Sequence, residues 1–340
     1  MANRPTLKTI AKLTGLSQMA VSKALRDADD ISGATKEKVK RVADELGYTP
    51  NVAARNLSSR RSTTIGMVVP EMGEDTAYDI IFNEISAEAA KLDYCVMLGS
   101  SNRSVQLEEQ HCRMMAGNQA GVLIVAACTD ETAHIKAACG STPVIFIGGK
   151  SAPEEEYVLL CDYRNSGALA VEYLAGLGHR DIVLLTYNPE NRTIRQKEEG
   201  FCTAMKARGL TPRVLRTGHA SNTTLAGMDA VEILLRQDNF PTAIWCASDT
   251  MALGVMHALN FYQLSVPNDV SVMGHDDLYP DQDIKLTTFH TPMEWMGKEA
   301  VKLAVALMEH DSQVQPRQTF FPELVVRDTT RRPKLTKQIL

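Results

Sequence analysis

Short runs of apolar and β-branched residues alternate with longer amphipathic stretches between residues 63 and 328. The runs are TTIGMVV (63–69), YCVMLG (94–99), GVLIVAA (121–127), PVIFIG (143–148), YVLLCD (157–162), DIVLLTY (181–187), TAIWCA (242–247), DVSVMGHD (269–276) and FFPELVVRD (320–328). Strands separated by segments of helix length indicate parallel sheets with crossover helices. The layout of residues 64–160 recurs in 161–290, which predicts an α/β body of two similar lobes.

The first fifty residues show a different pattern, that of short capped helices. Three residues suit helix N-caps: Thr6 before 7–14, Ser17 before 18–26 and Ser32 before 33–46. Gly15 suits a turn between the first two helices. Two short helices joined by a glycine-containing turn are typical of the DNA-binding helix-turn-helix. On this pattern alone, a three-helix scaffold with an exposed polar face is an equal alternative.

The second of these helices carries side chains suited to reading DNA bases. If it enters a major groove, its exposed residues near the N-terminus meet base edges. Gln pairs with adenine, Lys reaches guanine O6 and N7, and Met contacts a thymine methyl group. The predicted DNA-binding residues of this region are the two caps and four helix residues: Thr6, Ser17, Gln18, Met19, Ser22 and Lys23.

Charge is distributed unevenly along the chain. The whole chain has a net charge of -5, but residues 1–62 hold twelve Lys or Arg and six Asp or Glu, a net of +6. The remainder therefore carries a net of -11. A basic module joined to an acidic body favours phosphate binding at the N-terminal end.

Cysteine usage and hydropathy indicate where the protein works. Its seven cysteines are an odd number and form no CxxC pair, which favours reduced thiols over disulfides or a zinc site. The N-terminus has no apolar export segment, and no apolar run approaches the roughly 18 residues that span a bilayer. We therefore expect a cytoplasmic protein without membrane contact.

Several strings resemble the LacI/GalR family of bacterial repressors. They are TLKTIAKLTGLSQMAVSKAL, SGATKEKVKRVADELGYTPN and AARNLSSRRSTTIGMVVP in the first 70 residues, then GHRDIVLLTY, SDTMALGVMHAL, VPNDVSVMGHDD and LTTFHTPMEWMGKEAVKL in family order. The resemblance covers nearly the whole chain. It implies a repressor that binds a pseudo-palindromic operator as a homodimer, with DNA affinity controlled by a small carbohydrate-like effector.

The resemblance also implies a domain layout. Residues 1–50 are expected to form the helix-turn-helix domain, 51–62 a hinge helix and linker, 63–332 a two-lobed periplasmic-binding-protein-like body with parallel sheets, and 333–340 a tail. The first lobe is expected at 63–160 and 293–318, and the second at 161–290 and 319–332. The chain should cross between lobes near Cys161, His290 and Gln318.

In the family, the hinge segment folds into a helix only on operator DNA, and two such helices lie in the minor groove. By this resemblance Leu57 is wedged between base steps, Asn51 caps the helix, Arg55 meets phosphates and Ala54 belongs to the same contact. An eight-residue helix is marginal in isolation, and an apolar wedge exchanges base unstacking for contact surface. The alternative is a flexible linker with scattered basic residues.

Loops that follow strands are where open α/β sheets bind ligands. The resemblance implies effector contacts at five such positions, Tyr78, Asp162, Ser248, Asp249 and Asp276, and at Lys197, outside these loops. Carboxylates at strand ends suit sugar hydroxyls. Each position has a plainer alternative: Asp249 as a helix cap, Lys197 as a solvated surface charge, and Tyr78 as a core residue.

Two features favour an acidic sugar as effector. Lys197 stands where the family usually has Arg, and Arg103 is a second candidate cation. The segment RTIRQKEEGF and the TP-x-E-x-M-G pattern at 291–297 are similar to the gluconate-repressor branch of the family. We therefore predict a sugar acid as the specific ligand class.

Catalytic motifs are missing from the sequence. Gly148-Gly149-Lys150-Ser151 is similar to the end of a P-loop, but Val144 stands where its first glycine is required. No HExxH, GxSxG or GxGxxG occurs, so we expect neither an enzyme nor a cofactor or metal. The main alternative to a regulator is a sugar-binding module without DNA function, which leaves residues 1–61 unexplained. Because the C-terminus lacks apolar heptads, a dimer is favoured over a tetramer.

Overall fold

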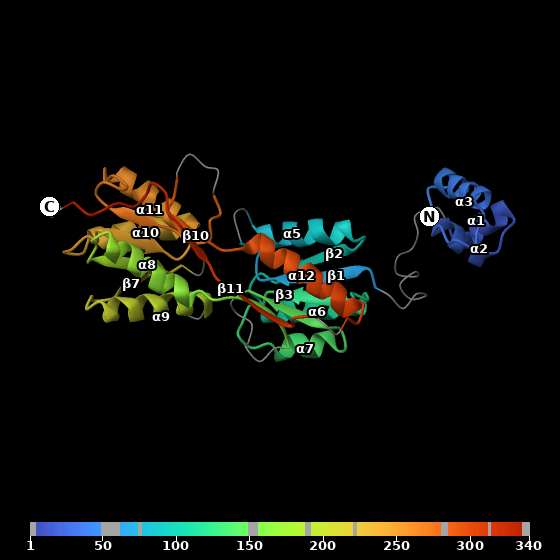
Figure 1. Ribbon diagram of the computed structural model, residues 1–340, viewed down its shortest axis with the longest axis horizontal. Helices are drawn as coiled ribbons and strands as arrows, with labels where there is room; N and C mark the ends of the chain where they lie inside the picture. The colour runs from blue at the N-terminus through green and yellow to red at the C-terminus, as the bar shows by residue number, and fades with distance from the viewer. Residues whose placement is uncertain are drawn as a thin grey trace. The chain divides into compact units, whose positions relative to one another are not determined.

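A computed structural model describes residues 5–48, 62–73, 77–148, 156–187, 192–219, 223–279, 285–311 and 314–334 (Figure 1). The chain divides into two compact units, Met1–Arg61 and Ser62–Leu340. The predicted DNA contacts Asn51, Ala54, Arg55 and Leu57 lie outside the described residues.

The first unit is a bundle of three helices, α1 (Leu7–Thr14), α2 (Gln18–Leu25) and α3 (Gly33–Glu45). The three predicted N-caps are confirmed, because the side chains of Thr6, Ser17 and Ser32 each accept a hydrogen bond from the backbone N–H three residues on. Such a cap satisfies an N–H group that has no partner within the helix. The core comprises Ile10, Ala11, Val21, Ala24, Val39 and Ala43.

The turn between α1 and α2 is the one that the sequence predicts. Gly15 has a φ of 72°, a left-handed conformation that glycine adopts without strain, and its N–H donates to the carbonyl of Ala11. Leu16 then packs against the core of the bundle. The turn therefore fixes the direction in which α2 leaves α1.

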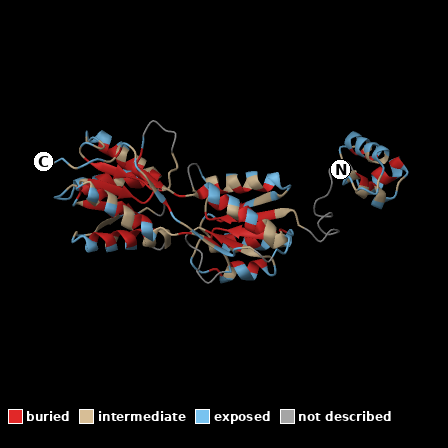
Figure 2. Ribbon diagram, viewed as in Figure 1, coloured by how far each residue is buried: buried red, intermediate tan, exposed pale blue. Residues whose placement is uncertain are grey.

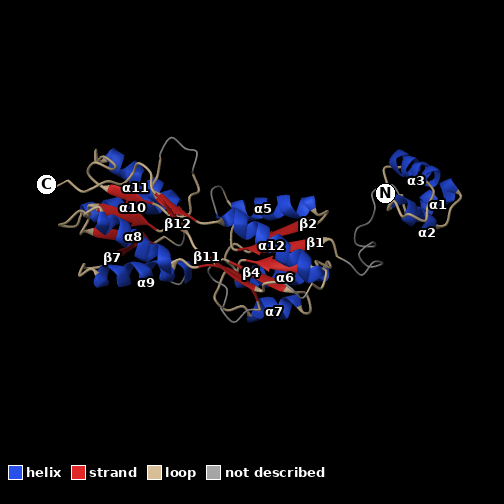
Figure 3. Ribbon diagram, in the orientation of Figure 1, coloured by secondary structure: helices blue, strands red, loops and turns tan. Residues whose placement is uncertain are grey.

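The second unit begins with a six-stranded parallel sheet, which we call the first lobe. Its strands are β1 (Thr64–Val69), β2 (Cys95–Ser100), β3 (Val122–Val125), β4 (Val144–Ile147), β5 (Tyr157–Cys161) and β11 (Arg317–Phe320), in the order β11-β5-β4-β3-β1-β2. One core cluster joins α5 (Ala77–Lys91) and α12 (Met293–Met308) to the sheet, and a second joins α6 (Val105–Gly117) and α7 (Ala133–Cys139) to it. The helices therefore lie on both faces (Figure 3).

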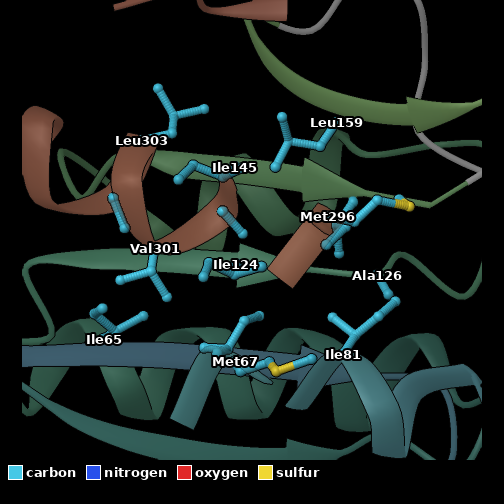
Figure 4. Packing of buried hydrophobic residues seen from close by; sticks show 14 of the residues in the cluster. Ile65, Met67, Ile81, Ile124, Ala126, Ile145, Leu159, Met296, Val301 and Leu303 are labelled. Carbon is cyan, nitrogen blue, oxygen red and sulfur yellow. The ribbon is translucent and has the colours of Figure 1, made fainter. Parts of the chain in front are cut away.

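Alternation along the strands divides the side chains between these two cores. Ile65 and Met67 of β1 pack with α5 and α12, whereas Val68 packs with α6 and α7. Figure 4 shows the first of these clusters, in which Met296 and Val301 of α12 lie over Ile124. Because both faces are covered, the inner strands β1, β3, β4 and β5 are largely apolar and buried (Figure 2), whereas the edge strands β2 and β11 are more exposed.

The second lobe repeats this arrangement around a four-stranded parallel sheet. Its strands are β6 (Ile182–Thr186), β7 (Arg213–Arg216), β8 (Ala243–Cys246) and β9 (Ser271–Met273), in the order β7-β6-β8-β9. Helices α8 (Arg164–Gly176) and α9 (Arg192–Ala207) share one core cluster, and α10 (Thr224–Leu235) and α11 (Asp249–Phe261) share the other. An antiparallel pair, β10 (Thr288–His290) and β12 (Glu323–Val325), accompanies it. The prediction of an α/β body with two similar lobes is confirmed.

Some strands were not predicted. β7 reads RVLR and lies at the edge of its sheet, so only half of its residues are apolar. β11 reads RQTF and is also an edge strand, and β10 has only three residues. Neither edge strands nor very short ones need the apolar run that marks a buried strand.

Three chain segments join the two lobes. The chain leaves the first lobe between β5 and α8, returns between β10 and α12, and leaves again between β11 and β12. Within the described residues, none of the helices is both long and apolar enough to cross a membrane.

Candidate functional site

A cleft that is partly open to solvent lies between the two lobes. Both lobes contribute to it, and its polar lining includes Glu71, Tyr78, Arg103, Lys197, Ser248 and Asp276. Four of the six predicted effector residues therefore meet in one place: Tyr78, Lys197, Ser248 and Asp276.

Lys197 is the buried cation of the cleft. Its side chain belongs to α9 and is only 3% exposed, so a solvated surface charge is excluded. Its Nζ donates to the carbonyl O of Ala247 at 2.7 Å and lies 4.9 Å from the centroid of the Tyr163 ring. Burial lowers the pKa of Lys197, while Asp276 opposes that shift.

Asp276 is the carboxylate that balances this charge. Burial alone would raise the pKa of Asp276, but Lys197 and His275 outweigh it and lower this pKa to about 2. Oδ1 accepts hydrogen bonds from His275 Nδ1 at 2.9 Å and from Thr291 Oγ1 at 3.3 Å. Its φ of 106° lies in the left-handed region, where a residue other than glycine is strained. Strained residues of this kind concentrate at ligand sites.

An ion pair, Arg103–Glu71, faces the cleft from the first lobe. Arg103 binds Glu71 through two hydrogen bonds, of which that from Nε to Oε2 measures 2.9 Å. Three tyrosines, Tyr78, Tyr163 and Tyr187, complete the lining, and burial raises the pKa of each, which keeps their phenols neutral. Aromatic faces with a few fixed polar groups are typical of sites for small polar ligands.

The remaining predicted effector residues have structural partners. Asp162 lies before α8 and its Oδ1 accepts from the N–H of Arg164 at 2.9 Å. Asp249 is buried, and its carboxylate accepts from the N–H of Leu278 at 2.8 Å and from Thr288 Oγ1 at 2.5 Å. Neither belongs to the described lining of the cleft. The cap of α11 is Ser248 rather than Asp249, since Ser248 Oγ accepts from the N–H of Met251.

Sequence reasoning missed several cleft residues. Tyr163, Tyr187 and Thr291 line the cleft but were not predicted. Tyr163 directly follows Asp162, and Tyr187 ends the predicted strand 181–187, so the rule that ligands bind at strand ends pointed to the correct loops. It did not indicate which residue of each loop faces the ligand.

One further ion pair joins the lobes. Arg195 of α9, in the second lobe, pairs with Asp130, which follows β3 in the first. Both side chains are more than 40% exposed, so the pair is worth little in free energy. It nevertheless shows that the two lobes are in contact at this point.

In the first unit, α2 presents the predicted base-reading residues. Gln18 and Met19 are exposed, Met19 with 71% of its surface free, and Ser22 is half-buried. Lys23 forms an ion pair with Asp30, and Arg26 Nε donates to the carbonyl O of Ser22 at 3.2 Å. An exposed Met beside polar side chains on a capped helix fits the geometry of a recognition helix.

Fold and cleft together define a class of protein: transcription regulators in which a two-lobed ligand-binding body controls a helix-turn-helix. Comparisons with known proteins agree. Residues 6–51 match the family of bacterial regulatory proteins, lacI family, and residues 171–330 match the periplasmic binding protein-like domain. The chain therefore carries the DNA-binding domain of the lacI family of bacterial regulatory proteins, joined to a periplasmic binding protein-like domain.

Relatives match over almost the full chain. An HTH-type transcriptional repressor PurR of Vibrio vulnificus is 29% identical, with 96% of this chain and 99% of the relative covered. A lac repressor dimer bound to operator and the anti-inducer ONPF superimposes with a TM-score of 0.86 at 26% identity, covering 97% and 100%. A transcriptional regulator CelR–cellobiose complex gives a TM-score of 0.70 at 25% identity, covering 96% and 100%.

Proposed function

We propose that this chain represses transcription by binding a pseudo-palindromic operator as a homodimer, and that a carbohydrate-like molecule in the cleft controls its DNA affinity. The observation that carries the proposal is the presence, in one chain, of an exposed reading helix and an interlobe cleft lined by a buried lysine, Lys197, and a carboxylate, Asp276. A ligand that prefers one arrangement of the lobes shifts DNA affinity by its differential binding free energy. We infer that the chain acts by binding rather than by catalysis, and in the cytoplasm, where its DNA lies.

Two-fold symmetry supports the operator proposal. A helix-turn-helix reads one half-site, and dimers bind two half-sites related by the symmetry of the protein. The lac repressor of the compared structure is a dimer bound to operator. We propose that Gln18, Met19, Ser22 and Lys23 read the bases and that Thr6 and Ser17 assist. Leu57, Asn51, Ala54 and Arg55, outside the described residues, remain predicted minor-groove contacts.

Replacing Gln18 by alanine is expected to weaken operator binding about 10-fold or more, because a bidentate Gln–adenine contact contributes roughly 1–3 kcal/mol. The operator is first selected from random DNA duplexes with the full-length protein, and affinities are then measured by gel shift. Leu13→Ala is the matched control, since Leu13 is also exposed but lies on α1. Failure of the full-length protein to select any sequence, or equal loss in both variants, would contradict the proposal.

The lining of the cleft supports a hydroxyl-rich effector. Asp276 accepts hydrogen bonds, the tyrosine faces pack against C–H groups, and Lys197 donates. The compared CelR complex contains cellobiose. Arg103 is paired with Glu71, whereas the buried Lys197 donates its hydrogen bond to a backbone carbonyl, that of Ala247, and so offers its charge to a ligand. We propose a sugar acid as the specific ligand, whose carboxylate shares Lys197.

Calorimetric titration with gluconate and with neutral sugars tests this ligand class. Gluconate is expected to bind, and Lys197→Gln to weaken that binding about 10-fold or more, since hydrogen bonds to charged groups contribute roughly 1.5–3 kcal/mol. The matched control is Lys206→Gln, an exposed lysine near the end of α9. If only neutral sugars bound, the sugar-acid part of the proposal would be contradicted, whereas a carbohydrate effector would still be supported.

A further inference from the structure

His275 is a fully buried histidine immediately before the cleft carboxylate Asp276. It follows β9 and packs among three aromatic rings, with centroid distances of 5.4 Å to Tyr163, 5.4 Å to Phe289 and 6.4 Å to Trp245. A phenylalanine would fill such an aromatic site without requiring any hydrogen-bond partner. A histidine ring in this place therefore needs hydrogen-bond partners for its two nitrogens.

Both ring nitrogens have partners. Nδ1 lies 2.9 Å from Asp276 Oδ1, and Nε2 lies 3.2 Å from Ser166 Oγ. An ionised carboxylate only accepts hydrogen bonds, so Nδ1 carries the proton. Burial, together with Lys197, lowers the pKa of His275 to about 4, which leaves the ring neutral at pH 7. Nε2 then accepts a hydrogen bond from the Ser166 hydroxyl, and Nδ1–H donates a hydrogen bond to Asp276.

This chain of hydrogen bonds is not a hydrolytic triad, although it contains the same three residue types. Ser166 and His275 have no exposed surface, so a substrate has no path to the serine hydroxyl. The partner that reaches the cleft is Asp276. The hydrogen bond from His275 Nδ1 therefore orients the carboxylate of Asp276.

The two carboxylate oxygens of Asp276 differ in their hydrogen bonds. His275 and Thr291 both donate to Oδ1, and within the described residues Oδ2 has no hydrogen-bond partner. Ser166 lies in the first turn of α8, just after the first segment that joins the lobes, and Thr291 lies within the second. The carboxylate is thus fixed through one oxygen, directly to the second joining segment by Thr291 and indirectly to the start of α8 through His275 and Ser166.

We infer that His275 is a positioning residue for the effector: its Nδ1–H fixes Oδ1 of Asp276, so that Oδ2 is presented to a ligand hydroxyl, and Ser166 fixes the ring. The inference rests on the proposed function of the cleft as an effector site. Preorganising an acceptor in this way removes the conformational cost of ordering it when the ligand binds.

The first test needs no ligand. Full-length protein labelled with 15N-histidine is studied by NMR at pH 7, and the His275 signals are assigned by their loss in His275→Phe. A neutral ring with its proton on Nδ1 is the expected result. A protonated ring, or a neutral ring with its proton on Nε2, would overturn the inference.

The second test measures binding of gluconate, and of glucose, by calorimetry. His275→Phe keeps an aromatic ring but loses both hydrogen bonds, and is expected to weaken binding at least 10-fold while selected operator affinity stays within 3-fold. His275→Asn, which retains a donor near the Nδ1 position, should recover most of the lost affinity, and Ser166→Ala should cost less than 3-fold. Equal affinity in wild type and His275→Phe would overturn the inference. If neither probe binds wild type, the proposed effector class fails, and the NMR result alone decides the role of His275.

Discussion

A Gly200→Ala substitution is expected to destabilise the second lobe by about 3 kcal/mol or more, the upper range for overpacking a close-packed interior. A Cβ atom at position 200 of α9 would lie 2.0 Å from the carbonyl O of Arg164 in α8. That oxygen belongs to the backbone, so the two helices must move apart. Thermal unfolding should show a midpoint lower by about 5–10 °C.

The control for this substitution is Gly176→Ala at the last residue of α8. A Cβ there meets nothing within 4 Å, so the midpoint should stay equal or rise slightly, because alanine favours helix over glycine. Gly167→Ala, whose Cβ would lie 2.4 Å from the N of Phe201, should behave like Gly200→Ala. If Gly200→Ala had the same unfolding midpoint as Gly176→Ala, the result would contradict the close approach of α8 and α9.

An Asp249→Asn substitution is expected to change how stability depends on pH. Burial raises the pKa of Asp249 from its ordinary 3.8 to about 7, although the hydrogen bond from Thr288 opposes the shift. A carboxyl whose pKa is higher in the folded state binds its proton more tightly there, so its contribution is complete below pH 3.8 and is lost as pH rises to 7. Asparagine resembles the protonated carboxyl and does not titrate.

The difference between variant and wild type is therefore the quantity to measure. Urea unfolding of the two proteins should give similar free energies at pH 4 and a gap of about 3–4 kcal/mol in favour of Asp249→Asn above pH 7. Asp238→Asn, at an exposed position, should follow the wild-type profile. Parallel profiles for Asp249→Asn and wild type would show that Asp249 ionises normally in the folded protein.

Local signals in the sequence predicted the fold well. Thr6, Ser17 and Ser32 stood at the helix starts because their side chains satisfy backbone N–H groups, an interaction confined to a few neighbouring residues. The buried strands were predicted because parallel sheets covered on both faces require continuous apolar runs. The edge strand β7 lacked that requirement and was missed.

The cleft was less predictable, because it depends on which way individual side chains face. At the end of β5 the prediction named Asp162, but Tyr163, one residue on, lines the cleft. After β8 it named both Ser248 and Asp249, and only Ser248 does so. Both pairs lie where a strand gives way to a helix, and successive residues there point in different directions, so an uncertainty of one position changes which side chain faces the cleft.

His275 and the glycines illustrate interactions that no local pattern encodes. The Ser166–His275 hydrogen bond joins residues 109 positions apart. Gly167 and Gly200 are likewise ordinary helix residues until α8 and α9 are brought together. Such pairings follow only from the packed structure.

The same close approach recurs on the other face of the second lobe, where a Cβ on Gly254 of α11 would lie 2.0 Å from the carbonyl O of Thr224 in α10. Helices in backbone contact on both faces of a sheet cannot slide past one another without breaking that contact. Shear, in which packed helices slide past one another, is therefore not expected within this lobe. We therefore expect the second lobe to move as one body, with closure by rotation about the three joining segments.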